Sequence, residues 1–284
     1  MSHSETSRRR FVLLAGGVLA TGLAGCAGGG TTLTGTAGTA ETDAMSNARA
    51  QATGPATATN GALPTTNDPT SAVANGMAAV RIAHLSPDAP NVDVRVDGRQ
   101  ALSNVGFGTV TPYVVLTPGS HNVRVTLAGH PLITVYDNDL SVDAKAYTVA
   151  AFGEVSGANH PFAVEVFTID ATAPPRDAAA VRLVHAAPDV PAVDVTAKGS
   201  NRTLFENVAF GQASDYVTLP AGTHTLEVRA HTPNHDGQVL ETADVTLRGG
   251  TVDSVFAVGS RSPPAGAAND AFRLVVAPES GGSS

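Results

Sequence analysis

Cysteine, lysine and aromatic residues are scarce in this chain of 284 residues. Cys26 is the only cysteine, which excludes a disulfide-stapled scaffold and a multi-cysteine zinc site. Lysine occurs only at positions 145 and 198, aromatics make up 5% of the chain, and tryptophan is absent. Charged residues reach only 15% with a net charge of −8, which excludes the basic footprint of a nucleic-acid-binding protein and the composition of a coiled coil.

Long hydrophobic runs are also missing. The longest apolar stretch covers residues 11–24, and a helix of about 14 residues rises only about 21 Å, whereas the hydrocarbon core is roughly 30 Å thick. A polytopic membrane protein is therefore excluded, and the stretch is more typical of a signal peptide than of a short membrane helix.

The sequence before this stretch indicates export. Arg8 and Arg9 follow a serine and precede Phe11, a pattern that resembles the twin-arginine signal. Residues 23–26, Leu-Ala-Gly-Cys, resemble a lipobox, in which the cysteine thiol receives a diacylglyceryl group and the chain is cut before it. We therefore expect a signal peptide at 1–25 and a lipid on Cys26 that holds the protein at the outer face of the cytoplasmic membrane.

Residues 26–78 have a different composition from the rest of the chain. They are rich in Thr, Ala and Gly and contain no Phe, Tyr or Ile. Such a segment buries too little apolar surface to offset its chain entropy, so we predict a disordered tether. A disordered tail is predicted likewise for residues 278–284. The acidic, lysine-poor composition resembles that of exported proteins from salt-loving archaea.

The remaining chain contains an internal repeat. Residues 80–94 recur as residues 181–195, with nine of fifteen positions identical. Each copy has apolar residues at every second position, and turn signals recur about every ten residues. We predict two antiparallel, immunoglobulin-like β-sandwiches at 79–170 and 180–277, joined by a proline-containing linker at 171–179.

The repeated motif resembles a known family. It reads His-x-x-Pro-Asp-x-Pro-x-Val-Asp-Val, followed by Asn-Val-x-Phe-Gly, a tyrosine, and Leu-x-x-Gly-x-His. This pattern is similar to domain of unknown function 4397, whose repeats occur in exported and lipid-anchored proteins of bacteria and archaea. The resemblance implies a fold and a location but no activity.

The motif also contains the candidate site residues of the folded part. Both copies have one histidine and two aspartates, which suit either a binding site or a structural role: His84, Asp88, Asp93, His185, Asp189 and Asp194. Each histidine is in phase with inward-facing apolar residues, and a Pro-Asp pair forms turns by itself, so the structural role is favoured. Asp93 and Asp194 flank inward valines and should face solvent or a neighbouring strand.

Neither catalysis nor a cofactor is predicted. Ser86, the only nucleophile in the motif, is replaced by Ala187 in the second copy, and no Gly-x-Ser-x-Gly or His-Glu-x-x-His motif is present. His231 and His235 have ligand-like spacing but no evident third ligand, so no metal site is expected. Asn201 begins a glycosylation sequon.

These patterns favour a non-enzymatic binding module of the cell envelope. Its partners would be the membrane, through the lipid, and an envelope glycan or surface protein, and two copies would raise avidity. The alternative is a solute-binding lipoprotein that holds a small ligand or metal ion between the repeats. A deep cleft lined by both His/Asp motifs would favour the alternative.

Overall fold

The computed structural model describes residues 63–157, 159–200, 202–263 and 270–280. The expected export residues Arg8, Arg9 and Phe11, the expected lipidation site Cys26 and the sequon residue Asn201 lie outside these ranges. Among the described residues, no helix has both the length and the hydropathy needed to cross a membrane.

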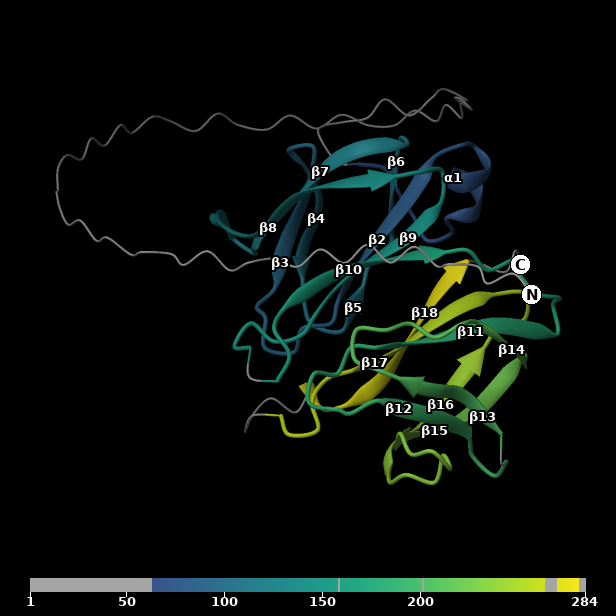
Figure 1. Ribbon diagram of the computed structural model, residues 1–284. Helices are drawn as coiled ribbons and strands as arrows, with labels where there is room; N and C mark the ends of the chain where they lie inside the picture. Colours follow the sequence, from purple (N-terminus) through teal and green to yellow (C-terminus); the bar gives the residue numbers. More distant parts are fainter. Residues whose placement is uncertain (1–62, 158, 201, 264–269, 281–284) are drawn as a thin grey trace, which may run out of the picture. The chain divides into compact units, whose positions relative to one another are not determined.

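The first repeat is built from short strands, as its alternating pattern predicts (Figure 1). Its elements are β1 (Thr65–Thr66), α1 (Thr70–Ala74), β2 (Ala78–His84), β3 (Val92–Val96), β4 (Arg99–Val105), β5 (Thr109–Val110), β6 (Tyr113–Leu116), β7 (Gly119–Leu127), β8 (His130–Val142), β9 (Ala146–Phe152) and β10 (Ala163–Ile169).

The second repeat has the same order of strands but no counterpart of β1, α1 and β5. Its strands are β11 (Ala178–His185), β12 (Val193–Ala197), β13 (Thr203–Val208), β14 (Val217–Pro220), β15 (Gly222–Ala230), β16 (Val239–Leu247), β17 (Val252–Val258) and β18 (Arg273–Ser280).

Each repeat is a sandwich of two sheets, which confirms the all-β prediction. One sheet, here called the outer sheet, has the order β4-β3-β7-β8 in the first repeat and β13-β12-β15-β16 in the second. The other, here called the interface sheet, has the order β1-β6-β2-β9-β10 or β14-β11-β17-β18. Both interface sheets contain one parallel pair, β2 with β9 and β11 with β17, among antiparallel neighbours.

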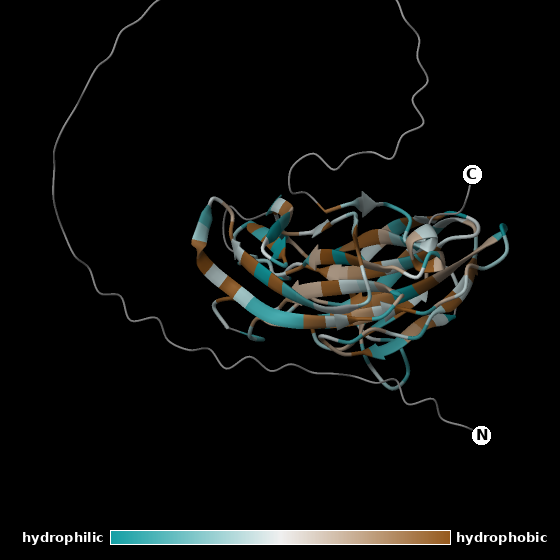
Figure 2. Cartoon of the chain, turned by 90° about the horizontal axis from the view of Figure 1, so that it is seen from above, coloured by the Kyte–Doolittle hydropathy of each residue, from teal (hydrophilic) through white to brown (hydrophobic). Residues whose placement is uncertain are grey.

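A separate core fills each sandwich. Apolar residues at alternating positions of the strands in both sheets form these cores. Figure 2 shows the alternation of hydrophobic and hydrophilic residues along the strands. The core of the second repeat contains the phenylalanines Phe205 and Phe272, whereas the fully buried core of the first contains Tyr147 as its one aromatic residue.

The two interface sheets also pack against each other. Ala83 and Leu85 of the first repeat share an apolar cluster with Val184 and Phe256 of the second. Strands β2 and β11 are accordingly buried on both faces. The repeats belong to one compact unit, so they are not independent modules on a short linker.

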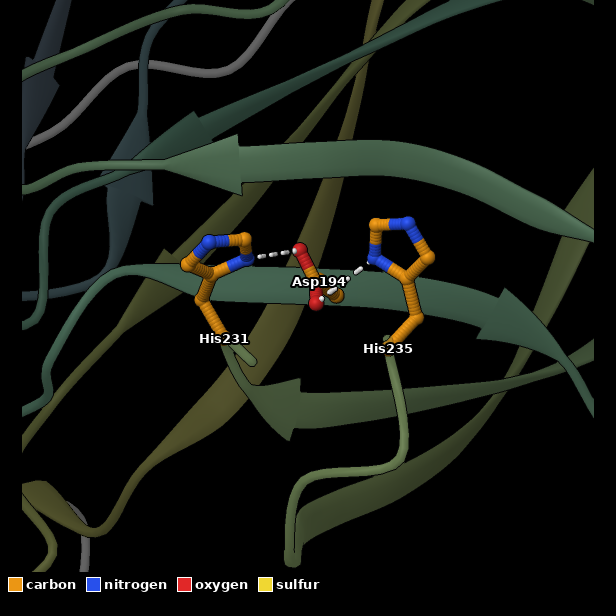
Figure 3. Close-up of side chains that lie close together, drawn as sticks. All are labelled: Asp194, His231 and His235. Carbon is orange, nitrogen blue, oxygen red and sulfur yellow. Dashed lines mark hydrogen bonds and ion pairs between the residues drawn. The ribbon is translucent and has the colours of Figure 1, made fainter. Parts of the chain in front are cut away.

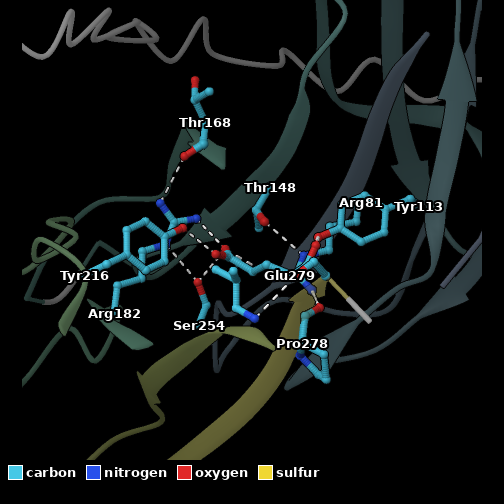
Figure 4. A network of polar contacts seen from close by, with 11 residues as sticks. Arg81, Tyr113, Thr148, Thr168, Arg182, Tyr216, Ser254, Pro278 and Glu279 are labelled. Carbon is cyan, nitrogen blue, oxygen red and sulfur yellow. Dashed lines mark hydrogen bonds and ion pairs between the residues drawn. The ribbon is translucent and has the colours of Figure 1, made fainter. Parts of the chain in front are cut away.

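A polar network crosses this interface with an approximate twofold relation (Figure 4). Arg81 Nη1 donates to the Pro278 carbonyl of the second repeat at 2.5 Å, and Arg182 Nη1 donates to the Thr168 carbonyl of the first at 3.1 Å. Both guanidinium groups pair with the carboxylate of Glu279, which is fully buried. One carboxylate thus partners two arginines that are themselves almost fully buried.

Two tyrosines complete the network. Arg81 lies over the ring of Tyr113, and Arg182 lies over the ring of Tyr216. Burial raises the pKa of both tyrosines, so each hydroxyl remains a donor. The Tyr216 hydroxyl donates to the Glu279 carboxylate, and the Tyr113 hydroxyl donates to the Glu279 carbonyl at 3.3 Å.

The prediction of a disordered tail from residue 278 was wrong for residues 278–280. These residues end β18, where Ser280 pairs with Val252 and Pro278 pairs with Asp253. Glu279 is therefore the extra residue of a β-bulge, and the bulge turns its side chain into the interface. Composition could not reveal this role, because a single glutamate between Pro and Ser looks like a solvated tail.

The predicted tether also ends earlier than residue 78. β1 pairs with β6 at the edge of the interface sheet, and Leu63 packs against the core of the first repeat. Ala72 and Val73 of α1 pack against the cluster around Tyr113. The average composition of residues 26–78 conceals these few apolar anchors.

Candidate functional site

The repeated histidines lie at the ends of β2 and β11. Nε2 of His84 lies 3.2 Å from the Pro90 carbonyl oxygen, and Nε2 of His185 lies 3.0 Å from that of Pro191. Burial lowers the pKa of both histidines, so each ring is neutral at pH 7 and donates its Nε2 proton to that carbonyl. Both histidines therefore hold the turn that follows their strand.

Asp88 and Asp189 fix loops that come late in each repeat. Asp88 accepts the backbone N–H groups of Val155 and Ser156 at 2.8 and 2.9 Å. Asp189 accepts those of Arg261 and Ser262 at 3.0 and 3.1 Å and the Ser260 hydroxyl at 2.7 Å. Burial raises the pKa of Asp88, but the N–H donors outweigh it and lower that pKa overall.

The same two aspartates line a cavity of about 690 Å³. Glu154 and Asp270 also line it, whereas His84 and His185 do not. The cleft that the sequence analysis considered is therefore present, but it is lined by the aspartates of the two motifs and not by their histidines. Those aspartate oxygens are already hydrogen-bonded to loop backbone.

The second aspartate of the motif differs most between the repeats. In the first, the half-buried Asp93 accepts the backbone N–H groups of Asn104 at 2.8 Å and Gly129 at 3.3 Å. Gly129 belongs to the two-residue turn between β7 and β8, where its φ is 73°. This aspartate therefore stabilises a tight hairpin and a neighbouring strand.

In the second repeat, an eight-residue loop replaces that turn. β15 ends at Ala230 and β16 begins at Val239. The loop covers Asp194 of β12, which is fully buried, so the expectation that this aspartate faces solvent is wrong. The alternative of a neighbouring strand agrees with the bond that it accepts from Asn207 of β13. The residues that cover Asp194 belong to this longer loop, which has no counterpart in the first repeat.

Two histidines of this loop bind the buried aspartate, one on each oxygen (Figure 3). His231 Nδ1 lies 2.8 Å from Oδ1 of Asp194, and His235 Nδ1 lies 3.1 Å from Oδ2. Asn207 donates its backbone N–H to Oδ1 at 2.8 Å. Both imidazoles are about three-quarters buried, with 26% and 28% of their side chains exposed.

Asp194 remains ionised in this environment. Burial raises its pKa, but the hydrogen bonds from Asn207, His231 and His235 outweigh burial and lower the pKa overall. A buried carboxylate with two imidazoles on it is a combination of ligand types that suits a divalent transition-metal ion.

The spacing of the ligand atoms fits one ion. One atom from each of Asp194, His231 and His235 lies within 4.8 Å of the other two. Nε2 of His235 lies 3.5 Å from Oε1 of Glu206, which places a second carboxylate behind a ligating imidazole. Such outer carboxylates commonly orient metal-bound histidines. Among the residues that the structure describes, this is the one group with three such ligands together.

The sequence analysis identified all three residues but did not connect them. It noted the spacing of His231 and His235, and it placed Asp194 in the repeated motif. Strand pairing supplies the connection, because Asp194 of β12 pairs with Arg229 of β15, two residues before His231. The sequence alone does not show this strand register, which places Asp194 next to the loop that contains both histidines.

Comparison with known proteins gave one family and several solved structures. A comparison with curated proteins found no match. A carbohydrate-binding module of family 26 from Eubacterium rectale, solved with maltoheptaose, has 13% identity and a TM-score of 0.21 over 70% of this chain and 95% of its own. A leucine-rich repeat protein from Bacteroides thetaiotaomicron has 15% identity and a TM-score of 0.16 over 63% of this chain and 25% of its own. Scores this low support no argument about function.

The family comparison is more informative. The model of the family described as "Domain of unknown function (DUF4397)" matches residues 78–196 and again residues 179–280. Together the two matches cover both sandwiches and most of the chain that the structure describes. The chain therefore belongs to the DUF4397 family.

Proposed function

We propose that this protein is a non-enzymatic binding module of the cell envelope that binds one divalent transition-metal ion in its second repeat. The observation that carries the proposal is the convergence of His231 and His235 on the buried carboxylate of Asp194. The twin-arginine and lipobox patterns support export, with attachment through Cys26 to the outer face of the membrane.

The types of ligand atom indicate which metal ion the site would bind. Two imidazole nitrogens and one carboxylate oxygen suit Zn²⁺, and also Cu²⁺ or Ni²⁺, better than Ca²⁺ or Mg²⁺, which prefer oxygen ligands. The ion would bind Nδ1 of each imidazole, so each neutral ring would carry its one proton on Nε2 instead of on Nδ1. Glu206 would then accept the Nε2 proton of His235.

Three protein ligands leave the fourth position of a tetrahedral ion open. An oxygen or nitrogen of an envelope glycan or surface protein is suited to that position. Both histidines are partly exposed, so this side of the site is accessible to such a partner.

A second candidate function is supported by the 690 Å³ cavity that Asp88 and Asp189 line. Its volume falls within the range of small-molecule sites. We favour the metal site over this cavity, because Asp88 and Asp189 already accept hydrogen bonds from the backbone N–H groups of loops.

Zn²⁺ titration against a colorimetric chelator tests the metal site. We expect the full chain to bind one Zn²⁺, and we expect affinity to fall at least tenfold in Asp194→Asn and in the double variant His231→Ala/His235→Ala. Affinity should also fall in acid, because metal binding requires deprotonated ligands.

The first repeat offers the matched control. Asp93→Asn changes the equivalent aspartate, which has no histidine on it. This variant should bind Zn²⁺ as the unchanged chain does. Equal loss of affinity in Asp93→Asn and Asp194→Asn would contradict the proposal, as would unchanged affinity in both.

Fractionation of cells tests the location separately. Cys26→Ser should leave the precursor uncut or release the protein to the medium, and replacing Arg8 and Arg9 by Lys should block export. Unchanged membrane retention in the cysteine variant, or normal export in the arginine variant, would refute this part of the proposal without affecting the metal site.

A further inference from the structure

The sandwich of the first repeat contains an apolar cavity of about 420 Å³. It lies between the interface sheet and the outer sheet, and none of its lining side chains carries a fixed charge. The lining is mostly aliphatic and includes Ile82, His84, Ala89, Val94, Tyr136 and Phe162.

The equivalent space in the second repeat is filled by larger side chains. Strand register aligns Val123, which lines the cavity, with Leu226 of the second repeat, because they pair with the equivalent residues Val96 and Ala197. The repeated motif aligns Ala89 with Val190, which is 3% exposed and belongs to the core of the second repeat. Larger side chains therefore occupy these positions in the core of the second repeat.

One polar atom in the lining has no partner. Nδ1 of His84 is buried and unbonded among the described residues, whereas Nδ1 of His185 accepts the backbone N–H of Ala187 at 3.3 Å. Because Nε2 of His84 donates to the Pro90 carbonyl, its neutral ring leaves Nδ1 as an acceptor. A buried acceptor without a donor is unfavourable, so a ligand hydroxyl or amine would be stabilised there.

The cavity is also accessible from outside. Val135 and Val155 line it and are 37% and 62% exposed. Leu132 and Ile133, on the same strand as Val135, are exposed as well. The entrance is therefore apolar, and the volume is that of a small-molecule site.

We propose that the first repeat binds a neutral, mainly aliphatic small molecule with one hydrogen-bond donor, which bonds to Nδ1 of His84. A charged ligand is disfavoured, because the lining offers no compensating charge. An apolar occupant restores the dispersion contacts that the cavity walls would otherwise lack. This site is independent of the metal site in the second repeat.

Displacement of the fluorescent probe 1-aminoanthracene tests the proposal. The full chain with Cys26→Ser is used, so that no attached lipid competes. The competitors are the isomers octan-1-ol and di-n-butyl ether, of which only the alcohol has a donor. We expect octan-1-ol to displace the probe at about tenfold lower concentration than di-n-butyl ether, because one hydrogen bond changes affinity by about that factor.

Three variants make the test specific. His84→Leu should abolish the preference for the alcohol while the ether still displaces the probe. Val94→Phe should fill the cavity and prevent probe binding with little change in melting temperature. Val195→Phe, at the equivalent position of the filled core, should lower the melting temperature clearly and leave any folded protein able to bind the probe.

Two results would overturn the proposal. The first is equal destabilisation by Val94→Phe and Val195→Phe, which would show that the first repeat has no space. The second is probe binding that neither Val94→Phe nor octan-1-ol reduces, which would place the probe elsewhere on the chain. If His84→Leu does not fold, the comparison of Val94→Phe with Val195→Phe still tests the proposal.

Discussion

At one position of the outer sheet, the first repeat has Asp93 beneath a two-residue turn, and the second has Asp194 beneath an eight-residue loop. Inside the sandwich the contrast is reversed, because the first repeat has a cavity and the second a filled core. The shared motif therefore preserves the fold, while short insertions and a few changes in side-chain size distinguish the repeats.

A third difference lies where the repeats meet. β10 pairs with β9 in continuous register, whereas β18 has a bulge that inserts Glu279. The arginines and tyrosines around it are paired between the repeats, but the carboxylate comes from the second repeat alone (Figure 4). The bulge in β18 alone thus supplies the carboxylate that both arginines share.

The largest expected effect comes from removing that carboxylate. Glu279→Ala leaves Arg81 and Arg182 as buried charges without their acid, so we expect a loss of about 3–5 kcal/mol in the free energy of unfolding. Urea unfolding followed by circular dichroism measures it. Glu206→Ala, at a largely exposed glutamate, should change stability by about 0.5 kcal/mol or less. A loss below about 1 kcal/mol in Glu279→Ala would contradict the role of the network.

Lowering the pH should destabilise both repeats, because each contains one buried neutral histidine. Burial lowers the folded-state pKa of His84 and His185 below 6.5, so the unfolded chain binds more protons as the pH falls through 6.5. The stability from these neutral rings is present above pH 6.5 and is lost toward pH 5, by no more than about 2 kcal/mol for each histidine over these 1.5 pH units.

Unfolding curves at pH 7.5 and 5 measure this loss in the unchanged chain, in His84→Leu and in His185→Leu. Each variant should flatten the pH dependence relative to the unchanged chain. Subtracting the pH dependence of each variant from that of the unchanged chain cancels the contributions of other titrating groups. One such group is His121, where burial lowers the pKa but the hydrogen bond with Asp97 helps to raise it overall. Parallel pH profiles for all three proteins would show that the histidines do not titrate differently on folding.

The smallest expected effect comes from the aspartates that fix late loops. Asp88→Ala should cost about 1 kcal/mol, and Asp189→Ala somewhat more, because Asp189 also accepts a serine hydroxyl. Differential scanning calorimetry compares the two melting temperatures. Intact stability together with lost binding to cells in the double variant would instead favour the cavity between these aspartates as the binding site.

Much of the fold follows from the sequence. Alternating valines and regular turn signals are sufficient for an all-β protein, because sheet faces have a period of two. The motif also indicates the inward direction of His84 and His185, since both are in phase with apolar neighbours.

The remaining features depend on long-range pairing. The parallel pairing of β2 with β9 and the contact between interface sheets have no local signature. Glu279 was missed because a bulge is set by register and not by composition. The proposed metal ligands were missed as a group because Asp194 and His231 are 37 positions apart, and only strand pairing brings them together.

X-ray absorption at the zinc edge tests the central claim, that the insertion in the second repeat makes a metal site. For the full chain loaded with one Zn²⁺, the account predicts nitrogen and oxygen neighbours at about 2.0–2.1 Å and the outer-shell scattering of two imidazoles. His231→Ala/His235→Ala should lose that imidazole scattering. Zinc bound without imidazole neighbours, or an identical spectrum in the double variant, would contradict the account.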